Sequence, residues 1–241
     1  MRMIGLTCWL AALLVALGTH PANATWSIVA VDPATGEVGG ASATCTPWAS
    51  AIFGVVPGKG IIVTQAASNK MARYRGEVLL MEGQSPENIV ALITDQAFDP
   101  THAIQQHGVV ALGFEKAAAG YTGADTGRAT GDLQGRGVSV QGNILAGSAV
   151  LTAALEAFQA ASQNPSFTLA DRLILALEAG AAQGGDRRCG DQTAISAYLV
   201  VARPGDSPQA PSLRIAIAEQ PRGGRNAVDL LRERYEQTAR R

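Results

Sequence analysis

The order in which strand-like and helix-like segments follow one another limits most strongly what this chain can fold into. The two kinds come in blocks: strands within residues 25–67, helices within 74–93, strands within 109–141, helices within 148–180, then two strands and a final helix. Single strands that alternate with single helices are typical of a parallel sheet, whereas blocks favour antiparallel sheets covered by helices. We therefore expect an α+β fold.

The block of strands at the start has the clearest pattern. Residues 25–31 place Thr, Ser, Val and Val on one face and Trp, Ile and Ala on the other, which is the alternation of a strand. Residues 32–36 (DPATG) are typical of a turn, and small residues follow from 37 to 44. This pattern predicts that the chain opens with a β-hairpin.

Further strands are predicted at residues 60–67, 109–114, 117–122, 137–141, 193–202 and 213–218. Helices are predicted at 74–81, after the cap residue Ser85, at 148–161, from the cap residue Thr168 to about 180, and at 226–241. No internal repeat and no low-complexity linker divides the 241 residues, of which 47% are hydrophobic. We expect residues 25–241 to form one domain that ends in the amphipathic helix 226–241.

Residues 1–24 have the pattern of an export signal. Arg2 provides a positive charge, residues 8–17 are apolar, and Ala22 and Ala24 are small side chains suited to signal-peptidase cleavage. The apolar stretch is shorter than the roughly 20 residues of a membrane-spanning helix, and no later stretch is longer. We predict that residues 1–24 are removed and that the protein is periplasmic or extracellular, without membrane contact; an uncleaved anchor is the alternative.

Charge and cysteine content narrow the classes of partner and cofactor. The formal charge of −1 at pH 7 gives no general attraction to phosphate backbones, so we expect no nucleic-acid partner. Cys45 and Cys189 are the cysteines after residue 24, and in an oxidising compartment they predict one disulfide; two free buried thiols are the alternative. The five-residue spacing of His102 and His107 and the lack of P-loop and HExxH motifs predict no metal and no cofactor.

Removal of residues 1–24 would make Thr25 the first residue of the chain. A free α-amine titrates at about 7.7 to 8.0 and lies beside the threonine hydroxyl, so one residue would supply both nucleophile and base. No histidine is then needed to accept the proton. Any strand can begin with threonine, so this position alone does not assign a catalytic role.

Five segments carry a family pattern: residues 25–39 (TWSIVAVDPATGEVG), 64–66 (TQA), 73–76 (RYRG), 140–147 (VQGNILAG) and 177–188 (LEAGAAQGGDRR). They resemble the family named domain of unknown function 1028, which is grouped with the N-terminal-nucleophile (Ntn) hydrolases. The resemblance extends from Thr25 to about Ala202. It implies a four-layer αββα sandwich with Thr25 at the end of a central strand, and it implies no particular substrate.

Within this pattern, several residues near the candidate nucleophile are assigned roles. Asn143, next to Gly142, is predicted to present an amide or a backbone N–H to a tetrahedral oxyanion; a simple Gly-Asn turn is the alternative. Ser27 lies on the same strand face as Thr25, and it is predicted, together with Arg73 and Gly142, to bind substrate. The alternative, equally compatible with the sequence, is that the Ser27 side chain only packs against its neighbours.

The loop that contains residues 184–188 provides the remaining candidates. Asp186 is predicted to be catalytic, and Arg187 and Arg188 are predicted to bind a substrate carboxylate from a loop hinged at Gly185. A salt-bridged loop that joins a helix to the next strand is the alternative.

These residues predict an exported Ntn-type amidohydrolase that cleaves an amide bond of a small peptide or acyl-amino compound through an acyl-enzyme on Thr25. The alternative is a catalytically silent module that binds a ligand or the cell wall through the loop at 184–188. The sequence leaves open whether copies of this chain form a homo-oligomer.

Overall fold

The computed structural model describes residues 25–239; the predicted export signal and the last two residues of the predicted C-terminal helix lie outside the described residues. The described strands form two sheets in which all neighbours are antiparallel. The larger sheet has the order β10-β9-β2-β1-β8-β7. Its strands are β1 (Thr25–Asp32), β2 (Glu37–Thr44), β7 (Gly131–Gly135), β8 (Val138–Asn143), β9 (Ser196–Ala202) and β10 (Leu213–Ile217).

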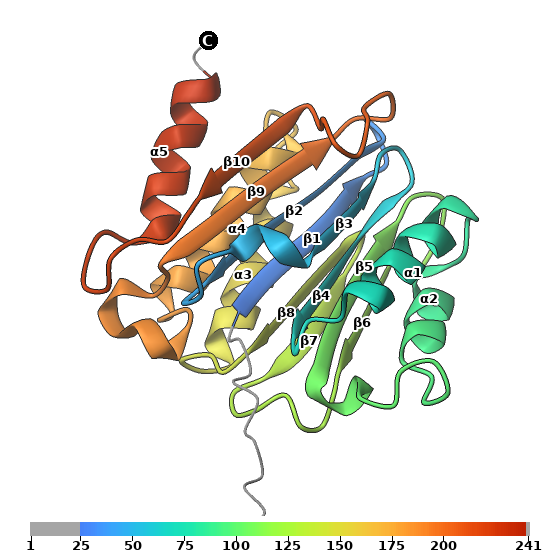
Figure 1. The fold of residues 1–241 in the computed structure, drawn as a ribbon. Coiled ribbons are helices and arrows are strands. Elements are labelled where there is room, and N and C mark those ends of the chain that lie inside the picture. Colours follow the sequence, from blue (N-terminus) through green and yellow to red (C-terminus); the bar gives the residue numbers. More distant parts are fainter. Residues whose placement is uncertain (1–24, 240–241) are drawn as a thin grey trace, which may run out of the picture.

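The smaller sheet has the order β3-β4-β5-β6 and lies against one face of the larger one (Figure 1). Its strands are β3 (Phe53–Val56), β4 (Gly60–Ala66), β5 (Gln105–Ala111) and β6 (Ala118–Thr122). Short 3₁₀ segments connect the strands and helices: η1 (Ala49–Ile52), η2 (His102–Ile104) and η3 (Arg187–Gln192).

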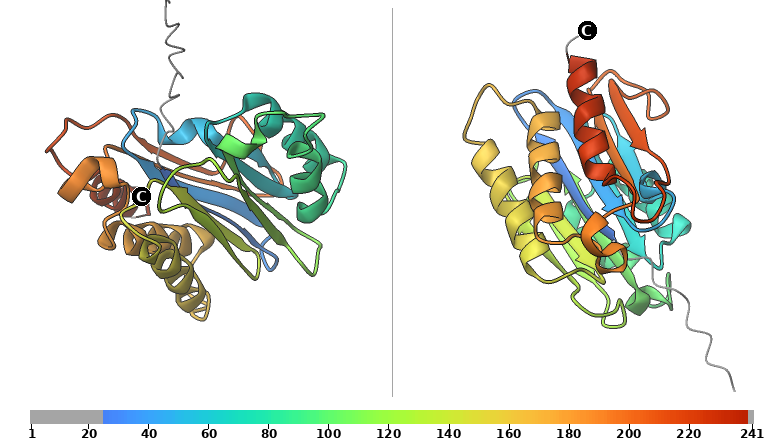
Figure 2. Two further views of the ribbon diagram at one scale, coloured as in Figure 1. Left: turned by 90° about the horizontal axis from the view of Figure 1, so that it is seen from below. Right: turned by 90° about the vertical axis from the view of Figure 1, so that its left-hand side faces the viewer.

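Helices cover the outer face of each sheet, as the two views in Figure 2 show. The larger sheet is covered by α3 (Ala149–Ala161), α4 (Leu169–Ala182) and α5 (Ala227–Ala239), and the smaller by α1 (Lys70–Met81) and α2 (Pro86–Ile93). The expected α+β fold of two antiparallel sheets with helices is confirmed, and its layers are helix, sheet, sheet and helix.

Each pair of adjacent layers has its own apolar core. Trp26 and Ile28 pack under α3 and α4, Val29 packs between the sheets, and Ile62 packs under α1 and α2. The central strand β1 therefore has its even-numbered residues toward the helices and its odd-numbered residues toward the second sheet, because successive side chains of a strand alternate. The alternation read from residues 25–31 and the opening hairpin are confirmed.

The predicted helix starts at Ser85 and Thr168 are also confirmed, whereas the helix predicted at 74–81 begins earlier, at Lys70, because the Asn69 side chain caps it. The Ser85 hydroxyl accepts a hydrogen bond from the Asn88 backbone N–H, and Thr168 and Asp171 form a reciprocal capping box. These caps satisfy backbone donors that a helix leaves unpaired in its first turn.

The structure corrects several of the predicted boundaries. β5 begins at Gln105 and not near residue 109, because the polar residues Gln105, Gln106 and His107 are fully buried inside the sheet. β9 begins at Ser196, since Thr193 has a left-handed φ of 59° that ends any extended run. The strands β3 and β7 and the 3₁₀ segments lack an apolar alternation and were not predicted.

A disulfide joins Cys45, just after β2, to Cys189 in η3, with 5.8 Å between the Cα atoms. The predicted bridge is therefore present and closes a sequence separation of 144 residues. Among residues 25–239, no helix is both long and apolar enough to cross a membrane.

Candidate active site

Thr25 is the first residue of the central strand and is only 3% exposed. Across the sheet it is in register with Thr44 of β2 on one side and with Asn143 of β8 on the other. Residues that lie opposite each other on antiparallel strands point to the same face, so all three side chains are directed toward the smaller sheet. The strand register thus places Asn143 beside Thr25, and its role as an oxyanion donor stays a prediction.

A cavity of about 90 Å³ adjoins Thr25 between the two sheets. Its walls come from the ends of β1, β2 and β4 and from the segment around η1. The lining residues are Thr25, Thr44, Thr46, Trp48, Ala49, Ala51, Ile52, Gln65, Ala66 and Ser68. A candidate nucleophile at the wall of a cavity can meet a reacting group there, and every lining side chain is uncharged.

A buried hydrogen-bond network fixes the strand that carries Thr25. Gln65 Nε2 donates to the Thr25 carbonyl oxygen at 3.2 Å and to Gln106 Oε1 at 2.8 Å. The Ser27 hydroxyl donates to Gln65 Oε1 at 2.6 Å and accepts from Gln141 Nε2 at 2.6 Å. Because these side chains are at most 1% exposed, the network connects β1 rigidly to β4, β5 and β8.

Ser27 therefore holds the sheets together behind Thr25, and its single hydroxyl proton is used by Gln65. The sequence indicates Gln65 only as part of the TQA motif, and no pattern in it points to the other polar or aromatic lining residues Thr44, Thr46, Trp48 and Ser68. Gln65 could have been found as a glutamine inside an otherwise apolar strand, where a buried amide needs partners.

Two residues next to the site have strained backbones. Ala66, which lines the cavity, has a φ of 64°, and Ile144, which follows Asn143, has a φ of 53°. Residues other than glycine rarely adopt this region, and such strain is retained where the surrounding structure enforces it, often at functional sites. The two strained residues flank the strand end where Thr25 lies.

Arg73 supports the cavity wall from behind. Its guanidinium donates to the carbonyl oxygen of Ala51 and lies 3.8 Å from the Glu77 carboxylate. Burial raises the pKa of Glu77, although the Arg73 charge acts in the opposite direction. Arg73 thus anchors η1 to α1, and its predicted contact with substrate stays a prediction.

Asp186 is completely buried and holds the loop at residues 184–192 against the end of β2. Its carboxylate accepts from the Cys45 backbone N–H at 2.7 Å, and it accepts from the Arg188 backbone N–H at 3.0 Å and guanidinium at 2.7 Å. This is the geometry of a salt-bridged loop, reinforced by the neighbouring disulfide. A catalytic role of Asp186 stays a prediction, as do substrate contacts of Arg188 and of the exposed Arg187.

Glycines of the motif segments 140–147 and 177–188 lie on the face of β1 that carries Trp26, opposite the cavity. The Trp26 indole N–H donates to the Leu177 carbonyl at 3.4 Å. A Cβ placed on Gly185 would lie 2.7 Å from the Trp26 ring, and a Cβ on Gly142 would lie 2.8 Å from Leu145. Both glycines therefore serve close packing under the helices, and neither lines the cavity. Their predicted substrate binding stays untested.

A further polar cluster lies on the face of the smaller sheet that α2 covers, with His107 fully buried and with His102 and Tyr121 half-buried. His102 Nδ1 is 2.6 Å from the Tyr121 hydroxyl, and His107 stacks on the Tyr121 ring with 6.0 Å between centroids. Burial lowers the pKa of His107 to about 4, so the ring is neutral at pH 7. Among the described residues, no group of three or more His, Cys, Asp or Glu side chains is arranged to hold a metal.

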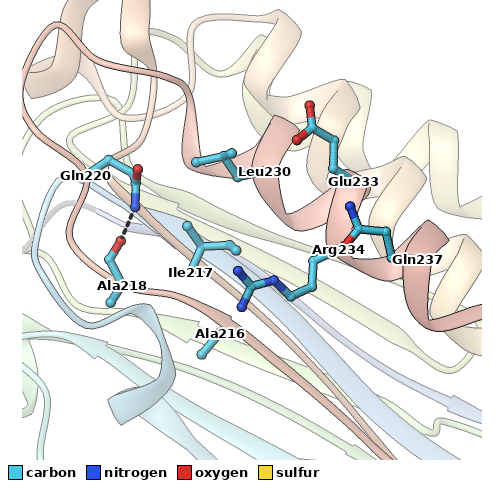
Figure 3. Close-up of a pocket in the computed structure, with 8 residues that line it drawn as sticks. All are labelled: Ala216, Ile217, Ala218, Gln220, Leu230, Glu233, Arg234 and Gln237. Atoms are coloured by element: carbon cyan, nitrogen blue, oxygen red, sulfur yellow. Dashed lines mark hydrogen bonds between the residues drawn. The ribbon is translucent and has the colours of Figure 1, made fainter.

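A hollow near the C-terminus is distinct from the Thr25 cavity. It has a volume of about 450 Å³ and lies between β10 and α5, where Glu233, Arg234 and Gln237 extend from the helix (Figure 3). Strands β9 and β2 separate β10 from β1, so this hollow does not reach the candidate nucleophile.

Comparisons with known proteins agree on one family. Residues 25–224 match the model of the Family of unknown function (DUF1028). A crystal structure of a protein from Silicibacter pomeroyi, assigned to the same family model, is similar with a TM-score of 0.74 and 28% sequence identity. The match covers 89% of this chain and 85% of that chain. No curated protein matches the chain.

Proposed function

We propose that this chain, which belongs to the DUF1028 family of unknown function, is an exported hydrolase of the Ntn type that cleaves amide bonds through Thr25. One observation carries the proposal: the residue predicted to become the N-terminus lies at the wall of a cavity, on the central strand of a two-sheet core. The helix–sheet–sheet–helix layers support placing the fold with the Ntn hydrolases. The disulfide is compatible with an oxidising compartment outside the cytoplasm.

In the proposed reaction the neutral α-amine of Thr25 takes the hydroxyl proton, directly or through one water, while Oγ attacks the substrate carbonyl carbon. The tetrahedral intermediate collapses when the ammonium returns this proton to the departing amine. An ester between Thr25 and the acyl group remains. A water molecule then gives a proton to the α-amine and attacks the ester, and the acid is released with Thr25 restored.

The surrounding residues give this chemistry its geometry. Gln65 fixes the carbonyl of Thr25, so the amine and the hydroxyl of the same residue have a defined position relative to the cavity. We assign the Asn143 amide, placed beside Thr25 by the strand register, as the oxyanion donor. The loss of one such donor typically raises the barrier by about 2.7 to 4 kcal/mol.

The test is covalent labelling by a β-lactone, followed by intact mass spectrometry and peptide mapping. The protein is prepared with Thr25 as its first residue, with one alanine added before it, and as the variants Thr25→Ala and Thr152→Ala. Thr152 is an exposed threonine of α3 and serves as the matched control. We expect one adduct, on Thr25, in the protein with the free terminus and in the control only.

Equal labelling of the alanine-extended protein would contradict a reaction that needs the terminal amine. The absence of any adduct on a folded protein with a free Thr25 would favour the catalytically silent binding module.

A further inference from the structure

The size of the Thr25 cavity restricts which acyl groups it can hold. Its volume is about 90 Å³. Drug-sized ligands occupy pockets of about 300 to 1,000 Å³, and an apolar cavity of about 150 Å³ holds one benzene molecule. The Thr25 cavity therefore has room for roughly three or four non-hydrogen atoms on the same scale.

The walls of the cavity restrict the charge that an acyl group in it can carry. Ala49, Ile52 and Ala66 provide buried apolar surface, and the polar part of the lining consists of hydroxyls and the Gln65 amide. The Arg73 guanidinium behind the wall is directed to the carbonyl of Ala51. No lining side chain offers an opposite charge to a carboxylate or ammonium group on the acyl chain. The Thr25 α-amine offers none either in the reactive state, because it must be neutral to accept the hydroxyl proton. Such a group would therefore lose its hydration without compensation, which is strongly unfavourable.

The mouth of the cavity has a different character. Trp48 belongs to the lining but is 66% exposed, so its indole lies at the rim in contact with solvent. An exposed tryptophan offers a large rigid apolar surface, and such side chains often dominate binding energies. The part of a substrate that does not enter the cavity would meet this ring.

We propose that the cavity is an acyl subsite for the two to four carbon atoms of a short uncharged acyl group, from acetyl to butanoyl, whose carbonyl oxygen is directed to Asn143 outside the cavity lining, and that Trp48 contacts the apolar amine portion of the same substrate. This inference rests on the proposed function, since it deepens the chemistry of the same threonine. It places the substrates among N-acylated amines with small acyl groups, and it excludes long-chain fatty amides and acyl groups that carry a second carboxylate.

The experiment compares kcat/KM for four aminocoumarin amides, whose acyl groups are acetyl, butanoyl, octanoyl and succinyl. We expect the two short neutral amides to exceed the octanoyl and succinyl amides by at least about tenfold, since a misfit of a few methylene groups has effects of that size. Ile52→Ala, which removes part of the buried wall of the cavity, should reduce the ratio of kcat/KM for the butanoyl amide to kcat/KM for the octanoyl amide by about tenfold. Ile52→Val provides a milder enlargement if the alanine variant does not fold.

Trp48→Ala tests the rim. It should raise KM for the aminocoumarin amides several-fold more than it slows the labelling of Thr25 by β-propiolactone, which has no amine portion. Phe98→Ala is the matched control, because Phe98 is a partly exposed aromatic residue outside the cavity lining.

The outcomes separate this inference from the proposed function. Labelling of Thr25 together with equal or faster hydrolysis of the octanoyl or succinyl amide would overturn the inference alone. A folded protein whose Thr25 is not labelled by β-propiolactone and that hydrolyses none of the four amides would overturn both.

Discussion

Replacement of Asp186 distinguishes a structural clamp from a catalytic carboxylate. In Asp186→Ala the Cys45 backbone N–H is left buried without its acceptor, which costs about 1 to 3 kcal/mol, and the cap of η3 is lost, which costs about 1 kcal/mol. The ion pair with Arg188 adds less than about 1 kcal/mol, because the Arg188 side chain is 29% exposed and therefore partly screened. We expect a loss of about 3 kcal/mol in the free energy of unfolding.

Asp186→Asn retains one side-chain oxygen that can accept from Cys45 and should lose only about 1 kcal/mol. Both variants are measured by urea unfolding without reductant, so that the disulfide stays closed. Asp125→Asn serves as the control, since Asp125 is an exposed aspartate in a turn.

The labelling rate of Thr25 by a β-lactone then decides the role of the carboxylate. A clamp predicts that folded Asp186→Asn is labelled within about threefold of the wild-type rate, whereas loss of a general acid or base typically slows a reaction by about 10² to 10⁴. A fully stable Asp186→Asn protein with a hundredfold slower reaction would refute the structural role, and so would an Asp186→Ala protein of unchanged stability.

Three further changes test the packing and electrostatics of the fold. Gly185→Ala should lower stability by about 2 to 4 kcal/mol, because its φ is +49° and the new Cβ would meet Trp26, whereas Gly83→Ala at a φ of +77° in open space should lose only about 1 kcal/mol in the same urea titration. Opening the Cys45–Cys189 disulfide, which spans 144 residues, should lower the melting temperature and remove about 5 kcal/mol from the free energy of unfolding; an unchanged melting curve after complete reduction would contradict this. His107 has a folded-state pKa lowered by burial to about 4, so the unfolded chain binds a proton first as pH falls below about 6.5, and roughly 3 kcal/mol of stability should be lost between pH 6.5 and pH 4. His107→Leu should flatten this part of the pH profile, and an equally steep profile would show that another group is responsible.

Local patterns were sufficient where a few neighbouring residues determine the structure. The alternation at residues 25–31 predicts β1, and Ser85 and Thr168 predict the starts of two helices, because capping is a local interaction. The bridge between Cys45 and Cys189 followed from an even number of cysteines after a predicted export signal. None of these inferences needs knowledge of contacts between distant segments.

The site residues that no sequence pattern indicates are brought together by contacts that only the fold creates. Gln65 and Gln106 are polar in sequence but satisfy each other and the backbone of β1 and β8 inside the core. Trp48 and Ile52 reach the candidate site because Arg73 fastens η1 against α1, which no spacing rule indicates. The charge of Asp186 is visible in the sequence, whereas its hydrogen bond from the Cys45 backbone N–H is not, and its catalytic role stays a prediction.

The most direct test of the proposed chemistry is the N-terminal mass of the protein recovered from cells that export it. We predict a chain that begins at Thr25 with an unmodified amine. A mature chain that begins at any other residue would leave the Thr25 hydroxyl without the base on which the mechanism depends.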